Sequence, residues 1–86
     1  MIDYVIVTLK FEKQSLQIDM ELPARIKTDE LEKRLLEALK EIDPTSFEGM
    51  EKVSLYHNGE RLHKEETLFE QAIWDGKILM VRESYE

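Results

Sequence analysis

Apolar and polar residues alternate along two stretches near the start of the chain. In residues 4–9 both faces are fairly apolar and β-branched residues dominate, which favours a central strand. Residues 16–21 alternate strictly between apolar and polar side chains, the pattern of a half-buried strand. The polar segment "FEKQ" separates the two and predicts a hairpin that ends at Pro23, because proline has no N–H to donate to a strand ladder. The core residues expected from this hairpin are Val5, Val7, Leu9, Leu16 and Ile18.

The next segment carries apolar residues at spacings of three and four, which predicts one apolar face of a long helix. These residues are Leu31, Leu35, Ala38, Leu39 and Ile42. Thr28 is the expected N-cap, and Pro44 ends the element because the residue before a proline disfavours the helical conformation. The charged residues between the apolar ones, from Glu32 to Glu41, are expected to face water. The loop that follows spans Asp43 to Glu51.

Turn signals divide the second half of the chain. Residues 53–57 alternate as a strand, and Asn58-Gly59 is a strong signal for a tight hairpin turn with a short return strand ending near Leu62. Thr67 is expected to cap a single turn of helix, because the segment is too short for a longer one. Residues 77–83 alternate again and predict a last strand. The further core residues expected here are Leu55, Leu62, Leu68, Ile73, Leu79 and Val81.

The triplet Trp74-Asp75-Gly76 admits a second interpretation, because small secreted helical-hairpin proteins join their two helices with a Trp-x-Gly turn. Such a hairpin needs a long amphipathic helix on each side, and neither side of this triplet has one. We therefore expect Asp75-Gly76 to turn the chain into the last strand. Trp74 is expected to cover one end of the core, with a binding role as the alternative.

The order of elements is hairpin, long helix, hairpin, one-turn helix and strand. It predicts a single α+β domain over residues 1–86, since a chain of this length supports one modest core. The sheet is expected to be mixed and five-stranded, with the long helix across one face. That is the β-grasp arrangement, in which the first and last strands are central and parallel and the third strand lies beside the last.

Specific residues add a family resemblance. The segment "LYHNGERLHKEETLFEQAIWDGKILMV" resembles the second half of ubiquitin-like domains, through the Gly59 turn, Thr67-Leu68 and Asp75-Gly76. The segment "SLQIDMELPARIKTDELEKRLLEAL" is similar to the YukD/EsaB family, small bacterial ubiquitin-like proteins of type VII secretion systems, through Leu22-Pro23-Ala24 and the helical leucines. The resemblance implies a cytoplasmic accessory protein that contacts components of the secretion machine. The loop from Asp43 is longer than the family pattern predicts.

Composition excludes several classes of partner. The 86 residues carry a net charge of −7, which argues against nucleic acid and anionic membranes because both require clustered Lys and Arg. The absence of cysteine excludes disulfides and thiolate metal sites. The apolar runs are far shorter than the roughly 18–20 residues that cross a bilayer, and the start lacks the features of a signal peptide. We expect a soluble, cytoplasmic protein without direct membrane insertion.

No residue pattern indicates an active site. His57 and His63 are the only imidazoles and are expected at the surface. The 19 acidic residues are expected almost entirely on polar faces, where burial does not separate their pKa values for acid–base work. The three glycines all belong to turns, so no phosphate-binding loop exists. We therefore predict no enzymatic activity, no cofactor and no metal.

One surface pattern does indicate binding. Apolar residues of three neighbouring strands are expected on the sheet face away from the helix, and soluble monomers rarely leave such patches bare unless they bind something. The predicted protein-binding residues are Tyr4, Ile6, Tyr56, Ile78 and Met80. Scattered surface side chains without a contact role are the alternative.

Three functions follow from these features. The first is a docking module of the secretion apparatus, which binds proteins through the sheet face or an edge strand. The second is a covalent modifier, which needs a narrow Gly-Gly tail, whereas this chain ends in "RESYE". We therefore expect no conjugation. The third is a ubiquitin-like adaptor unrelated to secretion, which stays open because a fold does not determine function. A homo-oligomer also stays open.

Overall fold

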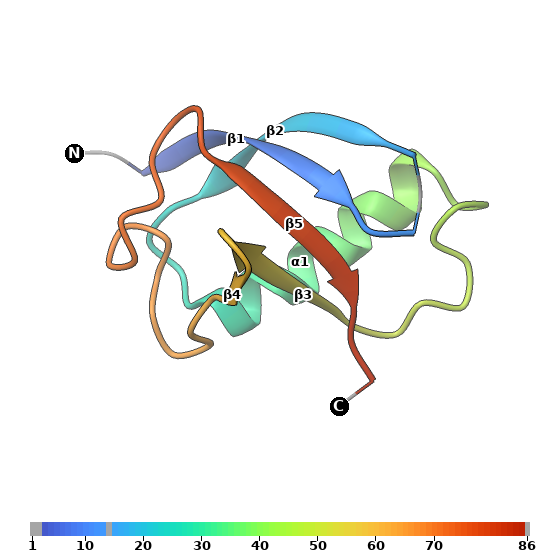
Figure 1. Ribbon diagram of the computed structural model, residues 1–86. Coiled ribbons are helices and arrows are strands. Elements are labelled where there is room, and N and C mark those ends of the chain that lie inside the picture. Colours follow the sequence, from blue (N-terminus) through green and yellow to red (C-terminus); the bar gives the residue numbers. More distant parts are fainter. Residues whose placement is uncertain (1–2, 14, 86) are drawn as a thin grey trace.

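Five strands form one mixed sheet, and a single helix lies across one face of it (Figure 1). The computed structural model describes residues 3–13 and 15–85. The elements are β1 (Tyr4–Phe11), β2 (Gln17–Pro23), α1 (Thr28–Ile42), β3 (Val53–His57), β4 (Glu60–Arg61) and β5 (Ile78–Glu83). The strand order is β2-β1-β5-β3-β4, with β1 and β5 parallel at the centre and the other neighbours antiparallel. This arrangement confirms the predicted β-grasp fold.

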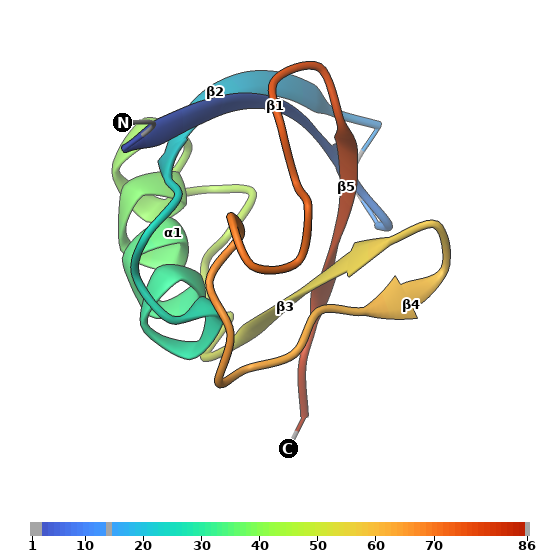
Figure 2. The same cartoon turned by 90° about the vertical axis from the view of Figure 1, so that its left-hand side faces the viewer.

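The hydrophobic core lies between α1 and the inner face of the sheet. Figure 2 shows α1 on one side of the sheet. Of the core residues predicted outside α1, Leu16 and Ile18 are only partly buried and pack against the edge of the core, and the others are buried. The core also includes residues that the sequence analysis did not assign to it. These are Phe11, Leu22, Ala24, Leu36, Phe47, Met50 and Val53.

The first strand and the loop after the helix contribute more to the core than predicted. Phe11 was expected in a polar turn, but it is the last residue of β1 and is buried. Its ring packs against Phe47, with 5.3 Å between the ring centroids. The loop from Asp43 to Glu51 therefore supplies the aromatic and methionine side chains that close this end of the core.

The buried face of α1 is rotated relative to the predicted one. Leu31, Leu35 and Leu39 are buried as expected, but Ile42 is 60% exposed. Glu32 and Leu36 are buried instead, so the prediction that Glu32 faces water was wrong. The helix turns this side toward the core because β3 and the chain after β4 lie next to it.

Thr28 does not act as the N-cap of α1. The N-cap position is Lys27, whose side chain makes no capping hydrogen bond. Thr28 is the first helical residue and is fully buried, and its hydroxyl donates a hydrogen bond to the Glu66 carbonyl at 2.7 Å and accepts one from the Gln71 amide at 3.0 Å. The residue thus anchors the start of the helix to the chain that follows β4.

The segment between β4 and β5 forms hydrogen-bonded turns where a one-turn helix was expected. Thr67 does cap the first turn, because its hydroxyl accepts the Glu70 N–H while the Glu70 carboxylate accepts the Thr67 N–H. Ala72 then adopts a positive φ of 59°, which stops any helical continuation. The hairpin turn is confirmed, since Asn58 and Gly59 both have positive φ. In the described part of the chain, no helix is long and apolar enough to cross a membrane.

Candidate functional site

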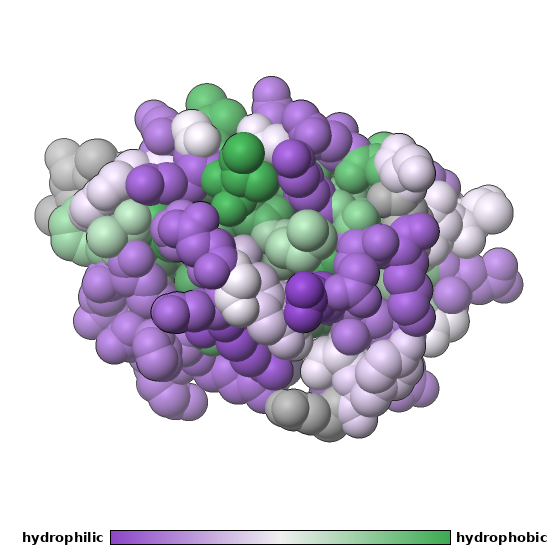
Figure 3. Space-filling view, viewed as in Figure 1, coloured by the Kyte–Doolittle hydropathy of each residue, from purple (hydrophilic) through white to green (hydrophobic). Residues whose placement is uncertain are grey.

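An oblique row of apolar side chains crosses the face of the sheet that points away from α1. We call it the outer stripe, and its members are Tyr4 and Ile6 of β1, Ile78 and Met80 of β5, and Tyr56 of β3. In the register of the sheet, Met80 lies directly opposite Tyr56, and Ile78 lies opposite Thr8. Ile6 is two residues before Thr8 on the same face, so it is a diagonal neighbour of Ile78. Figure 3 shows apolar side chains gathered near the middle of this face, over β1 and β5.

The members of the outer stripe differ in exposure. Tyr4, Ile6 and Ile78 are 58%, 53% and 51% exposed, whereas Met80 and Tyr56 are half-buried. The Arg82 guanidinium lies over the Tyr56 ring, 4.6 Å from its centroid, and covers part of it. The bare apolar surface is therefore concentrated on the two central strands, around the isoleucines.

Charged residues of opposite sign flank the two ends of the outer stripe. Glu21 lies opposite Ile6 on β2, and Asp19 lies opposite Thr8, whose hydroxyl donates to its carboxylate at 2.7 Å. At the other end, Lys10 lies opposite Met80, and Arg82 stacks on Tyr56 while its guanidinium forms an ion pair with Glu12. The sequence analysis did not assign these flanks, because they follow from strand register. The alternation of acidic residues along β2 was the signal that could have indicated them.

The Asp75-Gly76 turn holds the first isoleucine of the outer stripe in place. The Asp75 carboxylate accepts the Ile6 N–H at 2.7 Å, and the Gly76 N–H donates to the Ile6 carbonyl at 2.9 Å. The turn predicted from sequence thus joins the start of β5 to the middle of β1. Trp74, just before this turn, lies outside the buried core. Its indole ring packs edge-to-face against Phe69, with 5.7 Å between the ring centroids.

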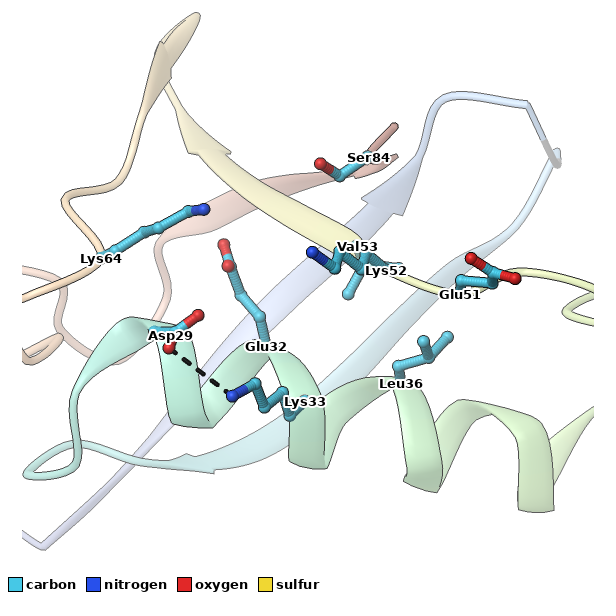
Figure 4. A pocket seen from close by; sticks show the side chains of 9 residues that line it. All are labelled: Asp29, Glu32, Lys33, Leu36, Glu51, Lys52, Val53, Lys64 and Ser84. Carbon is cyan, nitrogen blue, oxygen red and sulfur yellow. Dashed lines mark ion pairs between the residues drawn. The ribbon is translucent and has the colours of Figure 1, made fainter. Parts of the chain in front are cut away.

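A polar pocket of about 290 Å³ lies between α1 and β3 (Figure 4). It is lined by Asp29, Glu32, Lys33, Leu36, Glu51, Lys52, Val53, Lys64 and Ser84. Glu32 rises from the helix toward the strand, and Asp29 and Lys33 form an ion pair on the helix at 3.7 Å. The mixture of charges around the pocket does not define one ligand chemistry.

The Glu32 carboxylate has a structural partner. One oxygen accepts the Leu55 N–H at 2.9 Å, and the other lies 3.7 Å from the Arg61 guanidinium. Because β4 pairs with β3 only at Tyr56 and His57, the Leu55 N–H has no strand partner there and the helix supplies an acceptor. Burial raises the pKa of the Glu32 carboxyl above its usual value of 4.5, while the hydrogen bond from Leu55 and the charge of Arg61 oppose this shift in part.

The raised pKa predicts that Glu32 lowers stability as pH increases. Between 4.5 and the raised pKa the folded protein binds more protons than the unfolded chain, so the free energy of unfolding falls through this window as pH rises. Glu32→Gln keeps an acceptor for Leu55 without the buried charge. The stability of the wild type relative to this variant, measured by urea unfolding, is therefore expected to decrease as the pH rises above about 4.5.

Two further variants control this measurement. Glu37→Gln removes a carboxylate from the exposed side of the same helix and is the matched control for the loss of one charge. Glu32→Ala leaves the Leu55 N–H without its acceptor and is expected to be less stable than Glu32→Gln by about 1–3 kcal/mol at all pH values. A difference between the wild type and Glu32→Gln that does not change with pH would contradict the assigned role of burial.

The two histidines lie apart from the outer stripe. His57 ends β3 and is half-buried, and His63 is exposed beyond β4. Among residues 3–13 and 15–85, no group of three or more His, Cys, Asp or Glu side chains is placed to hold a metal ion.

Solved structures similar to this chain share its fold. The ubiquitin-like domain of EccD5 from Mycobacterium xenopi has 19% sequence identity and a TM-score of 0.77, with 96% of this chain and 97% of that chain covered. The ubiquitin-like domain of the Mycobacterium tuberculosis type VII secretion system protein EccD1 has 16% identity and a TM-score of 0.73, with 94% and 99% covered.

A third similar structure is part of a larger assembly. A chain of the MycP5-free ESX-5 inner membrane complex has 22% identity and a TM-score of 0.77. The alignment covers 98% of this chain but only 22% of that one, so the similarity concerns one domain of a longer protein.

The sequence itself matches one family model. No curated protein matches the chain significantly. The model of the protein YukD of the WXG100 protein secretion system matches residues 4–81, which include every strand and the helix except the last two residues of β5. The chain therefore belongs to the YukD family, as a ubiquitin-like domain associated with WXG100 (type VII) protein secretion.

Proposed function

We propose that this protein is a non-catalytic, cytoplasmic accessory component of a WXG100 secretion system that binds a protein of the secretion machine through the outer stripe. The observation that carries the proposal is the pair of neighbouring, half-exposed isoleucines on the two central strands, Ile6 and Ile78. The buried core lies on the opposite face of the sheet and does not require them to be apolar.

Physical chemistry favours a protein as the partner. A partner that covers the outer stripe removes apolar surface from water at the centre of the contact, while the charges at either end form a polar rim. The acidic side of that rim is Asp19 and Glu21, and Lys10 lies on the other side, so the rim has a charge polarity. The partner is therefore expected to carry an apolar patch, with basic residues on the side that faces Asp19 and Glu21 and acidic residues on the side that faces Lys10.

Similarity to proteins of secretion systems supports a component of the secretion machine as the partner. The family match over residues 4–81 favours this assignment over an adaptor unrelated to secretion. A similar domain in a chain of the ESX-5 inner membrane complex makes a component of that membrane machinery a reasonable candidate.

Deletion of the gene in the native host tests the assignment to secretion. WXG100 proteins are expected to disappear from the culture medium while remaining inside the cells, and expression of the wild-type chain from a plasmid should restore secretion. Immunoblots of medium and cell fractions measure both quantities. Unchanged secretion in the deletion strain would contradict the proposed function.

A further inference from the structure

The two edges of the sheet differ in how accessible they are to another strand. β4 forms one edge with two residues, whereas β2 forms the other with seven. Among the described residues, β2 has β1 as its strand neighbour on one side and none on the other. In an antiparallel pair, alternate residues direct their N–H and C=O groups away from the partner, so β2 presents a row of backbone groups to an added strand.

An apolar groove of about 290 Å³ runs between β2 and α1. Most of its lining is apolar and consists of Met20, Leu22 and Pro23 from β2 and Leu31, Leu35 and Ala38 from α1. Tyr4, Glu21 and Arg34 complete the lining, and Arg34 forms an ion pair with Glu30 at 3.2 Å. Met20 and Ile18 are half-buried on this side of β2, so their outer surfaces are open to a neighbour. Figure 2 shows β2 at the edge of the sheet on the side where α1 lies, which places the groove along that edge.

The other side of β2 is acidic. Asp19 and Glu21 alternate with Ile18 and Met20 and are exposed on the outer face of the sheet. Side chains of an added strand would also alternate, with one set over the groove and the other beside the two carboxylates. Directly opposite side chains on neighbouring strands lie close enough for opposite charges to attract and like charges to repel.

From these features we propose that the β2 edge and the groove bind an extended segment of a partner protein in which aliphatic residues alternate with lysine or arginine. The aliphatic side chains enter the groove against Met20 and Ala38, and the basic side chains pair with Asp19 and Glu21. The backbone of the segment adds a sixth strand to the sheet next to β2. This site adjoins the outer stripe, because Tyr4 also lines the groove and Asp19 and Glu21 lie between the two surfaces, but it does not depend on the function proposed for the outer stripe.

Inward-facing charges are one means by which edge strands avoid unwanted pairing, and β2 lacks them. Its groove-facing residues between the two ends are aliphatic, and no proline interrupts it before Pro23. The two carboxylates leave the edge open to a basic strand and repel an acidic one. The edge therefore selects its occupant by charge.

Titration with short synthetic peptides, followed by NMR on the full chain, tests this proposal. The probe is the acetylated and amidated peptide KVKIKVK, and EVEIEVE is its matched control. KVKIKVK is expected to cause saturable shifts of the amides of β2 and of the groove-facing turns of α1, with those of Ile78 and Met80 on β5 unchanged. EVEIEVE is expected to bind at least about tenfold more weakly.

A charge exchange and a backbone modification sharpen the test. The Asp19→Lys/Glu21→Lys variant is expected to reverse the preference and bind EVEIEVE more tightly than KVKIKVK. N-methylation of one alternate set of peptide amides should abolish binding, while N-methylation of the other set should leave it within about twofold, because only one set faces β2. A thermal melt confirms that the variant is folded.

Four results of the peptide experiments would overturn the proposal. They are the absence of saturable shifts with KVKIKVK, equal affinity for the two peptides, shifts centred on the outer stripe, and tolerance of N-methylation in both sets. Shifts of β2 that grow with protein concentration alone would show instead that a second copy of the chain occupies the edge, which also contradicts it.

Discussion

The double substitution Ile6→Lys/Ile78→Glu is expected to abolish secretion of WXG100 proteins while leaving the protein folded. Both side chains are half-exposed, so the new charges can reach water and the core is not disturbed. Lysine at position 6 lies opposite Glu21, which favours it, and the two new charges cancel, so the net charge of −7 is unchanged. Loss of two central apolar contacts is expected to weaken binding by at least about 100-fold.

The secretion assay in the deletion strain measures this effect. Ile42→Lys is the matched control, because Ile42 is an equally exposed isoleucine that lies on α1 and not on the outer stripe. It is expected to restore secretion as the wild type does. Circular dichroism and a thermal melt establish that the double variant is folded. Normal secretion by the folded double variant would show that the outer stripe is not the contact surface.

Leu35→Ala is expected to destabilise the protein by about 2–5 kcal/mol, the usual cost of truncating a leucine in a core. Leu35 is 2% exposed and packs in the middle of α1 against the sheet. For a chain of this size the whole free energy of unfolding is on the order of 5–10 kcal/mol, so the variant should unfold at a much lower urea concentration.

The same helix provides the control for this prediction. Ile42 was expected on the apolar face from sequence, but the structure leaves it 60% exposed. Ile42→Ala is therefore expected to change the free energy of unfolding by less than about 0.5 kcal/mol. Equal losses for the two variants in urea unfolding would contradict the orientation that the structure assigns to α1.

Local signals were sufficient to predict the order of elements. The period-two alternation of β1, β2 and β5 depends on a few neighbouring residues, and so does the Asn58-Gly59 turn, which needs positive φ at both positions. The order of elements predicted the β-grasp fold, and that fold in turn predicted that β1 and β5 are the central strands. These parts were predictable because each depends on contacts within a short stretch of chain.

The errors arose where distant segments decide which side chains are buried. Glu32 is buried because the short β4 leaves the Leu55 N–H without a strand partner, and no feature near Glu32 in the sequence indicates this. Phe47 lies in a loop without periodicity, and its burial depends on the ring of Phe11 across the core. The periodicity of apolar residues along the chain does not indicate such contacts between distant segments.

The outer stripe was predictable in part. Alternation indicated which side chains point away from the helix, and the structure places all five predicted residues on that face. Their unequal exposure was not predictable, because the cover over Tyr56 comes from Arg82 on a neighbouring strand. Their role in binding remains a prediction that only a partner can test.

Site-specific photocrosslinking in the native host tests the central claim most directly. A photoreactive phenylalanine derivative replaces Ile78 in one strain and Ile42 in another, and mass spectrometry identifies the adducts. Position 78 is expected to give a crosslink to a protein of the WXG100 secretion machine, and position 42 is expected to give none to that protein. A folded, functional protein that forms no such crosslink from position 78, or that crosslinks there only to a second copy of itself, would contradict the account.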